Sequence, residues 1–129
     1  MERSTARVLS TIEAYLDLMY DSDDHNFPEV FHELCQVHGV REGRLTAWSA
    51  SEFRKLMASR PSPASTGAPR QQEIIRVDEI APDMAAAKVR VRIGQTCFLD
   101  HLILHRIDGK WLVTSKGFHV EQQVMPPGS

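Results

Sequence analysis

Hydrophobic residues near the start of the chain recur at intervals of three and four. These positions are Val8, Leu9, Ile12, Tyr15, Leu16 and Met19. The spacing places them on one face of a helix, while polar Arg7 and Asp17 fall on the other face. Ser4 or Thr5 can act as the N-cap. The pattern therefore predicts a long amphipathic helix. The helix is expected to end at residues 21–26, which are turn formers.

Two shorter helices are predicted further along the chain. Residues 28–34 are expected to form the first, because proline is tolerated in the first turn of a helix. The second begins after Ser49, where Ser49 and Glu52 have the spacing of a capping box. Apolar residues follow the box at helical intervals: Phe53, Leu56 and Met57.

Alternating apolar and polar residues predict strands in the rest of the chain. The expected strands lie in a hairpin over 36–48, in 72–80 and 85–93, and in a long final hairpin over 96–120 around the turn Asp108-Gly109. Helices followed by antiparallel strands indicate an α+β domain, with helices on one side of a curved antiparallel sheet. We expect one domain over residues 1–121 and a disordered tail over 122–129.

Composition and charge exclude several classes of function. The net charge is −2 and the basic residues are scattered, so binding to nucleic acid is not expected. Neither a signal peptide nor a membrane-spanning segment is expected, and a cytoplasmic protein is expected. Cys35 and Cys97 lack metal-site spacing and are expected to be buried thiols. Residues 59–70 are rich in Ser, Pro and Ala, which predicts a mobile loop near a pocket mouth.

Asp100 does not fit the hydrophobic pattern of the final hairpin. It lies between Leu99 and Leu102, where a half-buried strand ordinarily carries an apolar residue. A carboxylate at such a position must be hydrogen-bonded, ion-paired or protonated. Asp100 is therefore the first candidate for a functional residue.

Several segments together carry a resemblance to a known superfamily. They are Phe31-His32, Phe98-Leu99-Asp100-His101-Leu102, Asp108-Gly109-Lys110-Trp111 and Lys116-Gly117-Phe118. From Arg7 to Val120 the chain resembles the nuclear transport factor 2-like superfamily, most closely its putative lumazine-binding branch; relatives include ketosteroid isomerase, scytalone dehydratase and polyketide cyclase. The resemblance implies a cone-shaped half-barrel, a fold that hosts isomerases, dehydratases, binding proteins and dimerisation modules.

The resemblance to ketosteroid isomerase implies catalytic candidates. Tyr15 and Asp100 fall where that family keeps the two donors of its oxyanion hole. The general-base aspartate of the family corresponds to Gly39 here, so the base is missing. A shift of one residue brings His38 to that place, and a neutral imidazole can act as a base. The candidates are Tyr15, Asp100 and His38.

The environment of Asp100 depends on the register of the final hairpin. A two-residue turn pairs position 100 with 117, whereas a three-residue turn with a glycine bulge pairs even positions with even ones. The resemblance favours the bulged form, with Leu112, Thr114, Lys116 and Phe118 on the concave face. Lys116 would then form an ion pair with Asp100. The sequence leaves open whether Asp100 is ion-paired or protonated.

The pattern and the resemblance together predict an apolar pocket between the first helix and the concave face of the sheet. Its expected lining is Met19, Phe31, Trp48, Phe53, Met57, Leu102, Lys116 and Phe118. The leading hypothesis is binding of a small aromatic or polyketide-like molecule, without a cofactor. The alternatives are a lyase or isomerase using acid and base chemistry, and a dimerisation module without a ligand. Whether the protein is an enzyme remains open.

The outer face of the final hairpin offers two histidines and several apolar residues. His101 and His105 are about 13 Å apart on one strand, which is too far for one metal ion. No metal site is predicted. Leu99, Ile103 and Ile107 share this face, and we expect it to form the interface of a homodimer.

Overall fold

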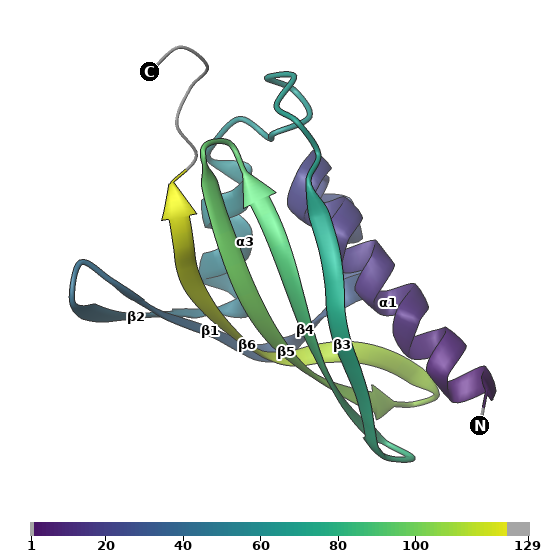
Figure 1. Cartoon of the computed structure of the whole chain (residues 1–129). Coiled ribbons are helices and arrows are strands. Elements are labelled where there is room, and N and C mark those ends of the chain that lie inside the picture. The colour runs from purple at the N-terminus through teal and green to yellow at the C-terminus, as the bar shows by residue number, and fades with distance from the viewer. Residues whose placement is uncertain (1, 124–129) are drawn as a thin grey trace.

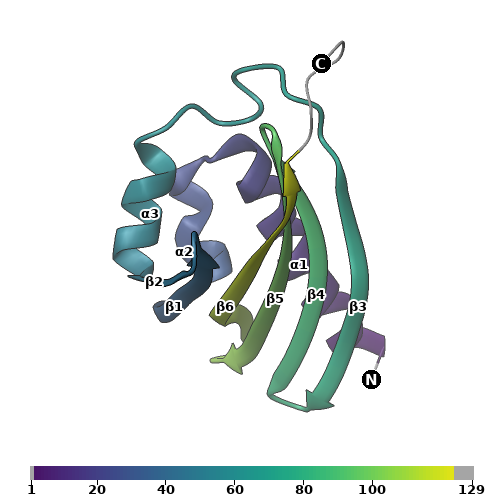
Figure 2. The same ribbon diagram turned by 60° about the vertical axis from the view of Figure 1, so that its left-hand side comes forward.

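The computed structural model describes the backbone of residues 2–123 and the side chains of residues 6–121. The elements in order are α1 (Glu2–Asp21), a 3-10 turn η1 (Asp24–Asn26), α2 (Phe27–Val30), β1 (Phe31–Arg41), β2 (Arg44–Ser49), α3 (Ala50–Ala58), β3 (Gln72–Ala81), β4 (Met84–Ile93), β5 (Thr96–Ile107) and β6 (Lys110–Gln123). The strands form one curved sheet in the order β2-β1-β6-β5-β4-β3, and the helices lie on one side of it (Figures 1 and 2). The α+β prediction is confirmed.

The sheet is mixed, whereas a purely antiparallel sheet was expected. β1 pairs with β6 in parallel, and every other strand pair is antiparallel. Local patterns identify hairpins, but they do not say which outer strand joins which edge. The β1–β2 hairpin joins the sheet next to β6, and this long-range pairing sets the direction of β1 relative to the other strands.

The second helix is shorter than predicted. It ends at Val30, and β1 begins at Phe31. Cys35 and Val37 are buried, while Leu34 is 77% exposed. Leu34 therefore does not belong to a buried helical face, and the two-residue period of a strand decides this segment.

The capping box of α3 is confirmed. The Ser49 side-chain oxygen accepts a hydrogen bond from the Glu52 amide at 3.2 Å, and the Ser49 amide donates to Glu52 Oε1 at 2.8 Å. This reciprocal pair fixes the helix start directly after β2. It also places Phe53 on the buried side of α3.

The register of the β5–β6 hairpin combines both alternatives that the sequence left open. Ile107 pairs with Lys110 across a two-residue turn, in which Asp108 and Gly109 both have positive φ. A bulge then leaves Thr114 as an extra residue on β6, so Asp100 lies opposite Phe118. Beyond the bulge, even positions face even positions.

Between the turn and the bulge, the buried face of β6 differs from the predicted one, because the two-residue turn sets the register there. Trp111 and Val113 are buried there, in place of Leu112 and Thr114. The hydroxyl oxygen of Thr114 lies 2.6 Å from His105 Nδ1. Lys116 and Phe118 keep their predicted place on the concave side.

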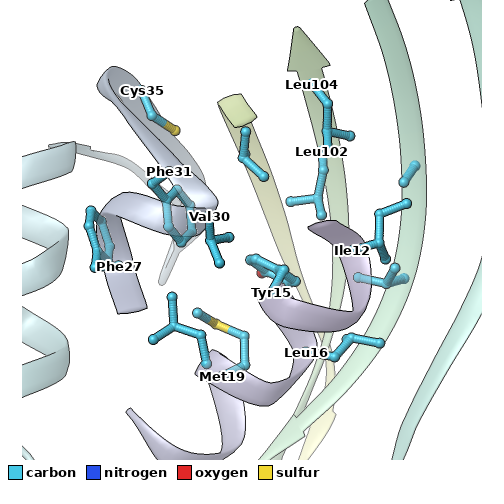
Figure 3. Packing of buried hydrophobic residues seen from close by; sticks show 14 of the residues in the cluster. Ile12, Tyr15, Leu16, Met19, Phe27, Val30, Phe31, Cys35, Leu102 and Leu104 are labelled. Atoms are coloured by element: carbon cyan, nitrogen blue, oxygen red, sulfur yellow. The ribbon is translucent and has the colours of Figure 1, made fainter. Parts of the chain in front are cut away.

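The core fills the space between α1 and the concave face of the sheet. Figure 3 shows Ile12, Tyr15 and Met19 of α1 pointing into this space, with Leu102 and Leu104 of β5 among the side chains around it. Cys35 and Cys97 are free, buried thiols, as predicted.

The segment between α3 and β3 is mostly exposed and is attached to α1. The Ala64 amide donates to the Tyr20 carbonyl at 3.0 Å, and the Tyr20 hydroxyl donates to the Ala68 carbonyl at 2.8 Å. These bonds hold the middle of the loop against the end of α1. Its mobility stays a prediction.

The predicted tail begins two residues too early, because β6 continues through Gln123. The rest of the predicted tail, residues 124–129, lies outside the described residues. Within the described part, no helix is both long and apolar enough to span a membrane.

Candidate functional site

Three polar side chains are buried together beneath the concave face. Tyr15 is fully buried, and Asp100 and Lys116 are 2% and 5% exposed. Tyr15 lies on the apolar face of α1, which the helical period turns toward the sheet. Asp100 and Lys116 come from neighbouring strands, and the Thr114 bulge places both on the concave side.

Tyr15 and Asp100 are directly hydrogen-bonded. The Tyr15 hydroxyl donates to Asp100 Oδ2 at 2.5 Å. Burial, followed by the charge of Asp100, raises the pKa of Tyr15 well above its ordinary value. The phenol therefore keeps its proton and its role as donor. The other carboxylate oxygen, Oδ1, is buried and has no hydrogen-bond partner among the described residues.

Among the described residues, the amine of Lys116 has only distant or weak acceptors. Its Nζ lies 3.8 Å from Asp100 Oδ2 and 3.6 Å from Met19 Sδ. It also lies 4.5 Å from the ring centre of Phe53 and 5.1 Å from that of Tyr15. Burial lowers the pKa of Lys116, and the smaller effect of Asp100 opposes it. The site therefore favours the neutral amine more than water does.

Cys35 lies within electrostatic range of Lys116 but remains an unreactive thiol. Burial raises the pKa of Cys35 to about 11, although the charge of Lys116 acts in the opposite direction. A thiol with this pKa is almost fully protonated at neutral pH and is a poor nucleophile.

A pocket leads from the surface to Asp100 and Lys116. Its walls are aromatic and aliphatic, and its charged groups lie at the floor and the mouth. The lining residues are Trp48, Phe53, Phe98 and Phe118, Leu56 and Ile93, and Arg41, Arg60, Asp100 and Lys116. The cavity has a volume of about 40 Å³. A cavity of this size holds a small group of a ligand, so the body of the ligand would extend toward the open surface.

The structure brings together about half of the predicted pocket residues. Trp48, Phe53, Lys116 and Phe118 line the pocket. The others are core residues: Met19, Phe31, Met57 and Leu102. Tyr15 is not among the lining residues. Its hydroxyl donates a hydrogen bond to the Asp100 carboxylate, so Tyr15 positions Asp100.

Arg41 and Arg60 line the pocket, but the sequence analysis did not single them out. Arg41 is the last residue of β1 and Arg60 follows the end of α3, and both line the pocket mouth. No local pattern links two arginines that are so far apart in the chain. Phe98 could have been found, because it alternates with Asp100 on one strand.

His38 does not join Tyr15 and Asp100. Gly39 faces the concave side and a Cβ at this position would overlap the ring of Phe118. His38 therefore faces the opposite side of the sheet, where it lines a shallow surface hollow with His101 and His119. Neither position offers a general base to the pocket.

One group of residues with metal-ligand atoms close together occurs among the described residues. It consists of Asp23, Asp24 and His25, which lie in the turn after α1 and are half-buried or exposed. Asp23 uses its carboxylate to accept from the His25 amide at 3.2 Å and so caps η1. This capping hydrogen bond accounts for the closeness of the three side chains.

The curved, unclosed mixed sheet with helices on one side is the NTF2-like fold. An NTF-2-like protein of unknown function from Silicibacter pomeroyi has a TM-score of 0.78 at 20% identity, over 93% of this chain and 98% of that one. A ketosteroid isomerase-like protein from Erwinia carotovora atroseptica has a TM-score of 0.70 at 14% identity, over 91% and 95%. At these identities the likeness concerns the fold.

Residues 3–119 match the model of the family described as putative lumazine-binding, so the chain belongs to that family. Among curated proteins, it is 28% identical over 116 residues to "Aldolase FrzH" of a Cladobotryum species, a match that covers 87% of each chain.

Proposed function

We propose that this protein binds a small organic molecule in the pocket and that Asp100 and Lys116 recognise its polar edge. The observation that carries the proposal is the unpartnered, buried Oδ1 of Asp100, a residue that lines the pocket. A buried acceptor without a donor costs about 1–3 kcal/mol, and a ligand that supplies the donor recovers this free energy. The neighbouring Lys116 amine can donate to a carbonyl of the same ligand.

The preferred ligand presents an N–H or O–H next to a carbonyl and has a flat apolar body. Trp48 and Phe118 are stacked with ring centres 5.9 Å apart, and such aromatic walls suit a planar molecule. The family description supports this choice, because lumazine is a flat dione whose edge carries N–H donors and carbonyl acceptors. Tyr15 holds Asp100 in place for this contact.

Lumazine is accordingly the first probe, and its binding can be followed by NMR titration. Lys116→Met should weaken binding about tenfold or more, since it removes a donor inside the pocket. Lys110→Met is the matched control, because Lys110 forms an exposed ion pair with Glu29 and lies outside the pocket. Equal affinity of the two variants would contradict the proposal.

A second variant guards against a folding defect. Lys116→Met alone leaves a buried carboxylate without its nearby cation, which is commonly destabilising. The double variant Asp100→Leu/Lys116→Met removes both groups and should fold, but it should not bind the probe. Tight binding by the folded double variant would show that Asp100 and Lys116 do not recognise the probe and would contradict the proposal.

An aldolase-like lyase is the second candidate, favoured by the Lys116 amine in the pocket and by the aldolase relative. In this reaction the neutral Nζ attacks a substrate carbonyl carbon, and the carbinolamine takes up a proton from solvent and loses its hydroxyl as water to leave an iminium. The iminium accepts the electron pair of the breaking carbon–carbon bond, while Asp100 takes the proton from the β-hydroxyl. This route needs no base at position 38.

Borohydride trapping tests the second candidate. The parent protein incubated with 4-acetylbenzoate and borohydride should gain the mass of the reduced adduct on the peptide that contains Lys116. Lys110→Met should be labelled equally, and Lys116→Met should not be labelled. Labelling spread over surface lysines would refute a special role of Lys116 and leave the binding proposal standing.

A further inference from the structure

Two arginines stand at the mouth of the pocket that ends at Asp100 and Lys116. Arg41 closes β1 and Arg60 follows α3, and the fold brings both to one opening. Both arginines line the same pocket as Asp100 and Lys116.

No carboxylate is paired with these two arginines among the described residues, in contrast to four other arginines of the chain. Among the described residues, neither side chain takes part in an ion pair or a hydrogen bond. The arginines that do pair with Asp or Glu are Arg54, Arg70, Arg76 and Arg90. The mouth therefore holds two guanidinium groups with unused donors.

The guanidinium groups also raise the positive potential of the pocket. Partial burial, followed by the charge of Arg41, lowers the pKa of Arg60. Arg60 in turn contributes to lowering the pKa of Lys116. The pocket thus contains three basic side chains and one acid in a chain whose net charge is −2. Like charges brought together in this way favour an anionic partner.

We propose that the ligand of this pocket is an anion, whose carboxylate is bound by Arg41 and Arg60 at the mouth while its carbonyl end reaches Lys116. Arginine suits this role because its planar fork of N–H donors matches the two oxygens of a carboxylate. The inference rests on the proposed binding function, and it adds the substrate class: small aromatic or conjugated oxo acids.

A matched pair of probes isolates the charge. 4-Acetylbenzoate and its methyl ester share the ring and the ketone and differ in the negative charge, and NMR titration gives both dissociation constants. The carboxylate should bind about tenfold tighter than the ester, the change that one charge-assisted hydrogen bond supplies. Added salt should narrow this difference, because the mouth is open to solvent.

Three variants assign the effect to the mouth. Arg41→Gln and Arg60→Gln should each remove most of the advantage of the carboxylate and leave the affinity for the ester unchanged. Arg44→Gln is the control: Arg44 begins β2, is exposed and does not line the pocket, so both affinities should stay at the parent values.

The outcomes separate this inference from the function on which it rests. If the ester binds as tightly as the carboxylate, and Lys116→Met still weakens both, the anion inference fails and the binding function stands. If Lys116→Met leaves both affinities unchanged, the binding function fails. Absence of binding by either probe at millimolar concentration would overturn both.

Discussion

At the scale of single residues, the site depends on how the carboxylate of Asp100 is satisfied. The sequence allowed a hydrogen bond, an ion pair or protonation. In the structure the Tyr15 hydroxyl is the close donor at 2.5 Å, and Lys116 Nζ is farther away at 3.8 Å. The phenol is therefore the main partner of Asp100, and the amine is left available to the pocket.

Replacement of Tyr15 by Phe tests this order of partners. The change leaves Asp100 without its closest donor, so the free energy of unfolding should fall by about 1–3 kcal/mol in urea denaturation. Tyr20→Phe is the control, since its hydroxyl bonds the Ala68 carbonyl in a partly exposed place; it should cost at most about 1 kcal/mol. Equal losses would show that the Tyr15–Asp100 hydrogen bond contributes no more to the free energy of unfolding than the Tyr20–Ala68 hydrogen bond.

The lowered pKa of Lys116 makes a prediction about pH. Between that lowered pKa and the ordinary value of about 10.4, the unfolded chain binds a proton at Lys116 that the folded chain does not bind. The free energy of unfolding should therefore rise with pH across this window. Urea denaturation of the parent should show the rise, measured relative to the Asp100→Leu/Lys116→Met variant. A difference that falls with pH would mean that the charge of Asp100 affects the pKa of Lys116 more than burial does.

At the scale of elements, the parallel pairing of β1 with β6 shapes one wall of the pocket. Gly39 and Phe118 are register partners across this pair, and the ring of Phe118 fills the space that a side chain at position 39 would need. The place of a general base in ketosteroid isomerase is thus occupied by an aromatic ring. This packing favours binding, or chemistry based on Lys116, over isomerase chemistry.

Gly39→Ala should be destabilising because the new Cβ would force Phe118 to move. We expect a loss of about 1–3 kcal/mol in thermal or urea denaturation, as for other overpacked sites. Gly117→Ala is a matched control on β6, where a Cβ would meet no atom within 4 Å. Phe118→Leu in the Gly39→Ala background should recover part of the loss. Parent-like stability of Gly39→Ala alone would disprove the tight packing.

At the scale of the whole molecule, the helices cover one face of the sheet and leave the other open (Figure 2). Val40 and Leu45 are 58% and 72% exposed, and together with Leu99 they line the shallow hollow that also holds His38. We call Val40, Leu45 and Leu99 the convex patch. Exposed apolar groups that cluster in this way mark interaction surfaces.

We predict that the convex patch joins two copies of the chain in a homodimer. Leu45→Asp should shift sedimentation at micromolar concentration from dimer to monomer, because a charge in a self-complementary interface is repeated by symmetry. Ile80→Asp is the control: Ile80 is 55% exposed but belongs to the far edge strand β3. A parent protein that sediments only as a monomer would refute the prediction.

The sequence by itself determined the features that depend on short-range patterns. The helical period identified α1, the Ser49–Glu52 box identified the start of α3, and Asp108-Gly109 identified the final turn. Asp100 stood out because a carboxylate interrupted an apolar strand. Each signal lies within a few residues, so local geometry suffices to read it.

Only the tertiary structure decided the features that join distant segments. The parallel β1–β6 pairing, the bulge at Thr114 that brings Lys116 beside Asp100, and the meeting of Arg41 with Arg60 all depend on contacts between strands and loops far apart in the chain. A bulge of one residue reverses the face of every side chain that follows it. For this reason the sequence could name Asp100 and Lys116 as partners, but the structure had to bring them together.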